Sequence, residues 1–195
     1  SLLFSMTTVT LILQQDTQLL VLRTGVNQLL TVRKSGASRF SIKYLMIKHR
    51  PQNTRKSMGN EWMQTHRSFS NNSFWDPNYI NYSILEVIND DRVQPHNFVP
   101  IHQHMDMEIL GYVVEGDCYH NDNLRNVLEV PAGGVQHMTA GSGIWHLEGN
   151  NTDTPIRYLQ SWLRPNKMGI QPVYDGHVFD KEDKLNNFCL IASQY

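Results

Sequence analysis

The sequence has 195 residues, of which 40% are hydrophobic and 18% charged, so it is long enough for a packed domain and too apolar for a disordered chain. Two cysteines, with no C-x-x-C spacing, exclude a disulfide framework and a zinc knuckle, and they favour a reducing, cytoplasmic setting. No apolar run approaches the roughly 18 residues that a membrane span needs, so we expect no membrane partner.

The formal net charge of −1 hides an asymmetry along the chain. Residues 1–67 carry ten basic and two acidic side chains, a net of +8, and residues 68–195 carry seven basic and sixteen acidic side chains, a net of −9. A basic segment is one signature of nucleic-acid binding. Here neither a helix-turn-helix pattern nor interleaved aromatic residues accompany it, so the sequence argues against a nucleic-acid partner.

Residues 1–45 have strand-like composition in places but poor two-residue alternation, as in Val9–Leu13, Leu19–Leu22 and Gln28–Val32. They share no turn spacing with the rest of the chain. We leave 1–45 as an unassigned segment, which we expect to be foreign to the domain, and begin the predicted domain at Met46.

From Tyr82 onward, short runs rich in β-branched and aromatic residues alternate with Gly, Pro and Asn turns. The predicted strands are Tyr82–Ile88, Glu108–Val114, Asn126–Val130, Val135–Thr139, Ile144–Glu148 and Ile156–Leu163. The predicted turns include Asn89–Asp91 and Asn121–Asn123. Even spacing of short strands predicts an all-β fold, either a sandwich or a barrel.

The chain becomes polar and loop-like over Arg164–Gly176 and regains one strand-like stretch at Phe188–Ala192. We therefore predict a domain over 46–165, followed over 166–195 by a linker and the start of a second domain.

Two pairs of side chains have the spacing of metal ligands. His102 and His104 are two residues apart, and His146 and Glu148 repeat that spacing 42 residues after His104. On a strand, residues i and i+2 point to one face about 7 Å apart and can converge on one ion. If the two strands are neighbours, three imidazoles and a carboxylate form a shell that suits Fe(II) and similar divalent ions.

A single H-x-H pair more often consists of ordinary surface histidines, but two such pairs, each beside a glycine-bearing turn, favour a metal site. The other six histidines have no such pairing, and we interpret them as loop or surface residues. They are His49, His66, His96, His120, His137 and His177.

Residues 62–176 resemble the pirin family, in particular the bacterial pirins described as quercetinases. The resemblance is carried by several blocks in order, namely Thr65–Ser70, Trp75–Pro77, Val87–Arg92, His102–Glu108, Tyr112–Gly116, Val130–Gly133 and Met138–His146. Pirins are bicupins with two jelly-roll-like β-barrels in tandem. The resemblance thus implies a cupin β-barrel, the N-terminal barrel of a bicupin, followed by an incomplete second barrel.

The resemblance also implies that His102, His104, His146 and Glu148 are the four metal ligands, in agreement with their spacing. Family members are associated with iron, so Fe(II) is the expected cofactor, with Ni, Co, Mn or Zn as alternatives. Their associated activity is quercetin 2,3-dioxygenase, which implies a flavonol and dioxygen as substrates. Other members are described as regulators that act through a protein partner.

Two residues near the ligands leave alternatives open. Glu108 either orients a histidine ligand from outside the metal shell or is a plain surface carboxylate. Trp145 stands where pirins carry a smaller or charged residue, so its ring either narrows the cavity or stacks on an aromatic substrate. The enzyme hypothesis makes Glu148 the catalytic base, because it is the only carboxylate of the shell. A metal-binding regulator without activity and an inactive truncated bicupin are the competing hypotheses.

Overall fold

The computed structural model describes residues 7–12, 20–24, 51–186 and 189–192. It divides into two units, residues 1–55 and 56–195. In the first unit, strands β1 (Thr7–Ile12) and β2 (Leu20–Thr24) form an antiparallel pair, and a 3-10 helix, η1, spans Gln52–Thr54. The strand-like run at Gln28–Val32 lies outside the described residues.

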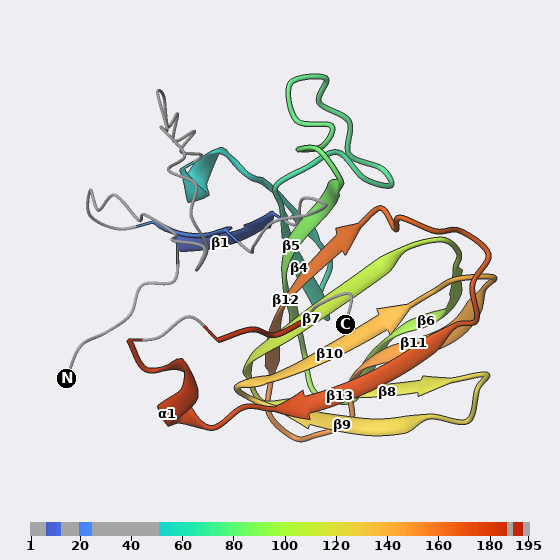
Figure 1. Cartoon of the computed structure of the whole chain (residues 1–195). Coiled ribbons are helices and arrows are strands. Elements are labelled where there is room, and N and C mark those ends of the chain that lie inside the picture. The colour runs from blue at the N-terminus through green and yellow to red at the C-terminus, as the bar shows by residue number, and fades with distance from the viewer. Residues whose placement is uncertain (1–6, 13–19, 25–50, 187–188, 193–195) are drawn as a thin grey trace. The chain divides into compact units, whose positions relative to one another are not determined.

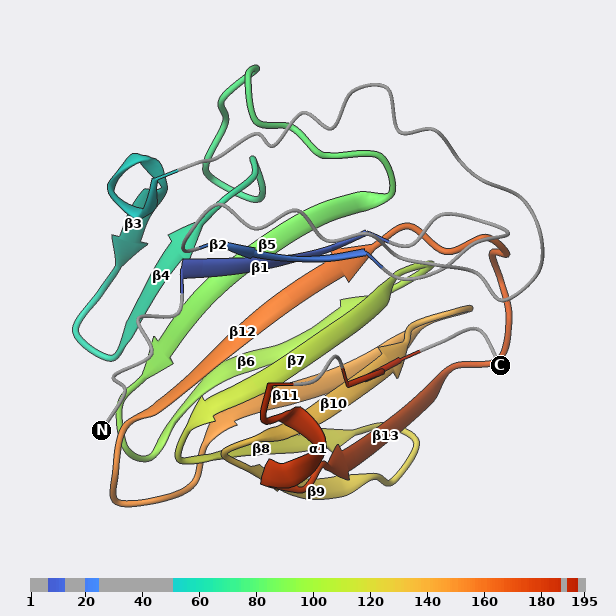
Figure 2. The same cartoon turned by 60° about the vertical axis from the view of Figure 1, so that its left-hand side comes forward.

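The second unit consists of two antiparallel sheets (Figures 1 and 2). The larger sheet has the order β13-β10-β7-β12-β5-β4-β3. Its strands are β3 (Lys56–Gly59), β4 (Met63–Arg67), β5 (Leu85–Val93), β7 (Glu108–Glu115), β10 (Gly134–Thr139), β12 (Ile156–Leu163) and β13 (Val173–Val178). The smaller sheet has the order β6-β11-β8-β9. Its strands are β6 (Asn97–His104), β8 (Asp117–Asp122), β9 (Val127–Pro131) and β11 (Ile144–Asn150), and a short helix α1 (Lys181–Lys184) follows β13.

The two sheets pack face to face because their strands alternate between buried and more exposed side chains. One core cluster joins Val93 and Val113 of the larger sheet to Cys118 and Val130 of the smaller one. All four side chains are at most 2% exposed. Each aliphatic side chain buried in this way stabilises the fold by about 1.5–3 kcal/mol. This sandwich of two antiparallel sheets confirms the prediction of an all-β, cupin-type barrel.

Gly116 allows the chain to pass from β7 in one sheet to β8 in the other. Its φ of +72° lies in the left-handed region, and a Cβ at this position would meet Cγ2 of Ile156 at 2.8 Å. The turn therefore requires glycine, and it sets where β8 enters the smaller sheet.

The prediction of a turn at Asn89–Asp91 was wrong, because these residues lie inside β5 and are buried. Arg157 of β12 donates from Nε and Nη2 to the two carboxylate oxygens of Asp90, at 2.8 and 2.9 Å. Such a bidentate pair satisfies a charge that would otherwise exclude Asp90 from a buried strand.

The C-terminal part of the chain also departs from prediction. Residues 173–178, assigned largely to a polar loop, form β13, which pairs with β10 along its whole length. Residues 189–192, the described part of the predicted strand Phe188–Ala192, form no strand. Part of the segment assigned to a linker thus belongs to the larger sheet.

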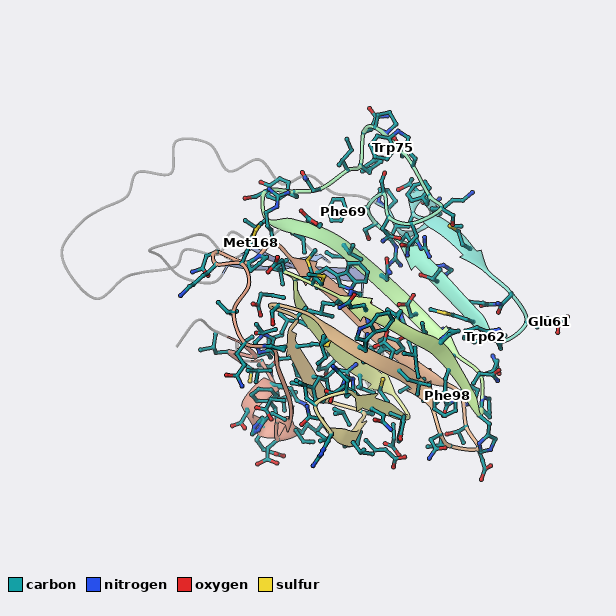
Figure 3. All side chains as sticks on the ribbon, turned by 90° about the vertical axis from the view of Figure 1, so that its right-hand side faces the viewer. Glu61, Trp62, Phe69, Trp75, Phe98 and Met168 are labelled. Carbon is teal, nitrogen blue, oxygen red and sulfur yellow. The ribbon has the colours of Figure 1, made fainter. Side chains whose placement is uncertain are left out.

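The loop between β4 and β5 carries Trp75 away from the sheets (Figure 3), and this side chain is 71% exposed. Within the described ranges, no helix combines the length and the apolar character needed to cross a membrane.

Candidate metal centre

The strand register brings the two predicted ligand pairs together. His102 and His104 lie on β6, and His146 and Glu148 lie on β11, its antiparallel neighbour. His146 is the direct register partner of His102. Because i and i+2 share a face, all four side chains point to the interior between the sheets.

The three histidine rings converge closely. Nε2 of His102 lies 3.0 Å from Nε2 of His104 and 3.0 Å from Nε2 of His146. One nitrogen from each ring falls within 4.8 Å of the other two, and within the described residues these three histidines form a group able to hold a metal ion. Two nitrogens that are each about 2.1 Å from one ion, at a right angle, are about 3.0 Å apart, so the spacing fits a shared cation.

The hydrogen bonds around His102 leave its Nε2 atom free to act as a ligand. Nδ1 of His102 lies 2.8 Å from the carbonyl oxygen of Pro100. A carbonyl oxygen only accepts, so Nδ1 carries the proton and a neutral His102 ring keeps its lone pair on Nε2. This lone pair points at the neighbouring imidazole nitrogens, which is the chemistry of a metal-ligand cluster.

Burial and mutual proximity favour the uncharged form of His104 and His146. Burial, followed by the charge of His102, lowers the pKa of His104 to about 4. The pKa of His146 is lowered further, first by burial and then by His102 and His104. Neutral imidazole is the form that binds metals, so the interior favours the ligand state at neutral pH.

Glu148 is buried and lies two residues from His146 on β11, but the group of three converging histidines does not include its carboxylate. Gln160 of β12 donates from Nε2 to Oε1 and Oε2 of Glu148, at 2.9 and 3.2 Å. Trp162 in turn donates from Nε1 to Oε1 of Gln160 at 2.7 Å, which fixes which end of the amide faces Glu148. Burial raises the pKa of Glu148, and the hydrogen bond from Gln160 opposes that rise.

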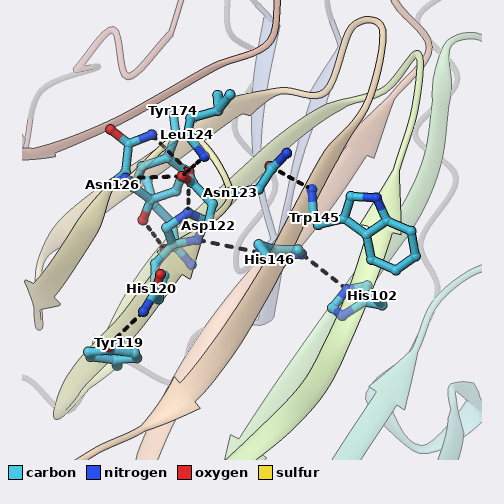
Figure 4. Close-up of polar contacts among 12 residues, drawn as sticks. His102, Tyr119, His120, Asp122, Asn123, Leu124, Asn126, Trp145, His146 and Tyr174 are labelled. Carbon is cyan, nitrogen blue, oxygen red and sulfur yellow. Dashed lines mark hydrogen bonds and ion pairs between the residues drawn. The ribbon is translucent and has the colours of Figure 1, made fainter.

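A buried histidine–aspartate pair, His120 and Asp122, lies next to His146 on the side away from His102 (Figure 4). His120 on β8 is 1% exposed, and its Nδ1 lies 3.4 Å from Nδ1 of His146. Nε2 of His120 lies 2.9 Å from Oδ2 of Asp122. The interpretation of His120 as a loop or surface residue was therefore wrong.

The sequence contains one signal for the pair His120 and Asp122. His120 and Asp122 have the same i, i+2 spacing as the predicted ligands, but they stand beside a cluster of Asn and Asp that is typical of a turn. Gln160 and Trp162 carried no such signal, because only the packing of the two sheets brings β12 to Glu148.

The structure places Glu108 and Trp145 away from the interior. Glu108 accepts hydrogen bonds from His137 at 2.9 Å and Thr139 at 2.7 Å, on the sheet face opposite to buried Ile109. Trp145 is 47% exposed, since it alternates with His146 along β11. Neither side chain reaches the small cavity beside the histidines. That cavity, of about 10 Å³, is lined by Ile109, His120, Gln136, Met138, His146, Glu148 and Tyr174.

Comparisons with known proteins identify the family of this chain. A family model described as Pirin matches residues 49–163. Quercetin 2,3-dioxygenase of Escherichia coli K12 is 41% identical over 136 residues, which are 69% of this chain and 59% of that protein. A pirin-like protein of Caulobacter vibrioides is 38% identical over 150 residues, which are 77% of this chain and 65% of that protein.

Solved structures show the same fold. The crystal structure of the bacterial pirin YhhW from Escherichia coli in complex with nickel(II) has a TM-score of 0.65 at 34% identity, and the match covers 73% of this chain and 66% of that chain. This chain spans less than two thirds of the length of each of the two curated relatives. The matched residues contain the complete four-residue pattern described above, and the chain belongs to the pirin family.

Proposed function

We propose that this chain carries the metal-binding barrel of a dioxygenase that opens the ring of flavonols such as quercetin with dioxygen. The observation that carries the proposal is the convergence of His102, His104 and His146, with their Nε2 atoms 3.0 Å apart in two of the pairs. Glu148 adds a carboxylate on the same face of β11. The name of the Escherichia coli relative supports the choice of substrate.

The proposed ligands are His102, His104, His146 and Glu148. The contacts from Gln160 occupy part of the Glu148 carboxylate, which has about four lone-pair positions and so retains some for a metal. Three nitrogens and one oxygen suit Fe(II), our preferred ion, and also Ni, Co, Mn and Zn. The nickel(II) complex of the related pirin supports a divalent ion as the cofactor.

When bound, the ion supplies a Lewis acid that lowers the pKa of the flavonol 3-hydroxyl. Glu148 accepts the hydroxyl proton, at Oε2, which has the longer of the two contacts with Gln160. In the metal-free protein burial raises the pKa of Glu148, and a bound cation would oppose that rise. Ring opening by dioxygen then releases carbon monoxide.

The size of the interior cavity restricts where the substrate binds. About 10 Å³ admits no more than about one water molecule, so a flavonol cannot lie beside His120 and Tyr174. We place the ring system of the substrate on the outer side of the cluster, where His102 and His104 are only partly buried, with its 3-hydroxyl directed through the proposed metal site toward Glu148.

Both cysteines are free thiols, which supports the proposed cytoplasmic setting.

The test is turnover by the purified chain after metal removal and reloading with Fe, Mn, Co, Ni or Zn. We expect oxygen-dependent loss of quercetin absorbance together with carbon monoxide release, and no change under argon. Tight metal binding without turnover under any of these ions would contradict the dioxygenase and would favour a regulator that acts through a protein partner.

A further inference from the structure

The pair His120–Asp122 has no place in the proposed reaction, although it lies against one of its ligands (Figure 4). We infer that Asp122 and His120 form a positioning relay that fixes the protonation pattern of His146, so that its Nε2 lone pair faces the metal. This inference rests on the proposed metal site and concerns two residues that do not touch the metal themselves.

The first step concerns Asp122, which is surrounded by hydrogen-bond donors. Its Oδ1 accepts from the backbone N–H groups of Leu124 at 2.8 Å and Asn126 at 3.0 Å. Its Oδ2 accepts from Nδ2 of Asn126 at 2.8 Å and lies 2.9 Å from Nε2 of His120. An ionised carboxylate only accepts, so Nε2 of His120 is the donor and carries the ring proton.

The second step follows from the single proton of a neutral imidazole. His120 is 1% exposed and donates from Nε2 to Asp122, so a neutral His120 ring can only accept at Nδ1. The partner of Nδ1 is Nδ1 of His146, at 3.4 Å. His146 must therefore carry its proton on Nδ1, which leaves a lone pair on Nε2, the atom that lies 3.0 Å from Nε2 of His102.

The third step concerns the orientation of the His120 ring. It stacks on Tyr174 with the centroids 3.5 Å apart and the planes 4° apart. The hydroxyl of Tyr174 donates to Oε1 of Gln136 at 2.7 Å, which holds the phenol in place. Strand β13 thus contributes indirectly to the metal centre, because Tyr174 keeps the His120 ring aligned with His146.

A histidine ligand whose second nitrogen is held by an outer partner binds its metal more tightly, and loss of such a partner typically weakens affinity about 10–100-fold. His120→Phe keeps the stacking on Tyr174 but removes the acceptor. His120→Asn keeps an oxygen or nitrogen close to the position of Nδ1. Asp122→Asn keeps the shape of the loop but offers an amide N–H to His120, which reverses the protonation pattern along the relay.

The experiment has two readouts on the purified full chain. Nitrogen-15 NMR of the metal-free protein reads the protonated ring nitrogen of His146, and titration with Co(II) gives the affinity and the visible spectrum of the bound ion. We expect Nδ1–H in the parent, a shift toward Nε2–H in His120→Phe and Asp122→Asn, and about 10–100-fold weaker Co(II) binding in both. His120→Asn should recover most of the affinity, and His137→Phe, away from the interior, should match the parent.

Nε2–H on His146 in the parent would overturn the inference, as would His120→Phe with parental affinity and spectrum. The NMR readout needs neither bound metal nor turnover, so it separates this inference from the dioxygenase proposal. If His120→Phe does not fold, Asp122→Asn decides the question by the same two readouts.

Discussion

Gln160 and Glu148 belong to different sheets, and their side chains meet between them with Nε2 of Gln160 2.9 Å from Oε1 of Glu148. Both residues are buried, at 4% and 6% exposure. This hydrogen bond joins the two layers at the proposed metal centre. The indole of Trp162, which lies edge-on to His104 with the centroids 4.9 Å apart, sets the orientation of the Gln160 amide.

Replacement of Gln160 tests the contribution of this bond. Gln160→Leu removes the Gln160 donor from the buried Glu148 carboxylate, so we expect the free energy of unfolding to fall by about 1–3 kcal/mol. Urea denaturation of the metal-free chain measures the change. Gln64→Leu, on the exposed face of β4, is the matched control and should stay within about 0.5 kcal/mol of the parent. Equal stability of the two variants would contradict the prediction.

His102→Ala should abolish metal binding and turnover together. His102 lies between His104 and His146, so its loss removes both 3.0 Å contacts of the cluster. Metal content after reloading, measured by elemental analysis, and quercetin turnover are the readouts. His66→Ala, on β4, is the control and should retain both. A His102→Ala protein with a full equivalent of metal would rule out His102 as a required ligand.

Glu148→Gln separates metal binding from proton transfer. The amide keeps the shape of the side chain but cannot act as a base, so we expect much of the metal to be retained while turnover falls about 10²–10⁴-fold. Glu108→Gln, away from the interior, should turn over like the parent. Normal turnover in Glu148→Gln would show that another group takes the substrate proton.

The buried carboxyl group of Asp91 should make the free energy of unfolding depend on pH. Burial raises its pKa from 3.8 to about 7, and the charge of Glu148 acts in the same direction. Between these pH values the native state holds a proton that the unfolded state has lost. Raising the pH therefore favours unfolding, by up to about 1.4 kcal/mol per pH unit.

Asp91→Asn removes this contribution, so its stability relative to the parent should increase from pH 4 to pH 7. Urea denaturation of the metal-free proteins across that range measures the difference. Asp153→Asn, whose parent side chain is 96% exposed, should run parallel to the parent curve. If the stability of Asp91→Asn ran parallel to that of the parent across this pH range, the pKa of Asp91 in the native parent would lie near its ordinary value.

The fold class and the ligand pattern could be read from the sequence because both depend on local periodicity. The i, i+2 spacing of His102 with His104, and of His146 with Glu148, requires only that each pair lies on a strand. Alternating burial and turn residues likewise marked the strands that became β7, β10, β11 and β12. These are properties of short segments, and no distant contact is needed to recognise them.

The buried polar contacts could not be predicted from local periodicity. Asp90 and Asp91 are typical of a turn, and Arg157, 67 residues from Asp90 in sequence, makes the buried strand acceptable for Asp90. His120 and Asp122 also stand in a turn-like context, and only the pairing of β8 with β11 places them behind His146. The strand or turn propensity of a residue reflects only its neighbours in sequence. Here the contacts that decide the structure come from distant parts of the chain.

The sequence by itself therefore determined that this is an all-β protein with two ligand-like pairs. Only the tertiary structure decided that β6 and β11 are neighbours, that Gln160 reaches Glu148 across the sandwich, and that His120 stands behind His146. The physical reason is that strand periodicity is local, whereas register and sheet packing are set by side chains that meet from distant parts of the chain.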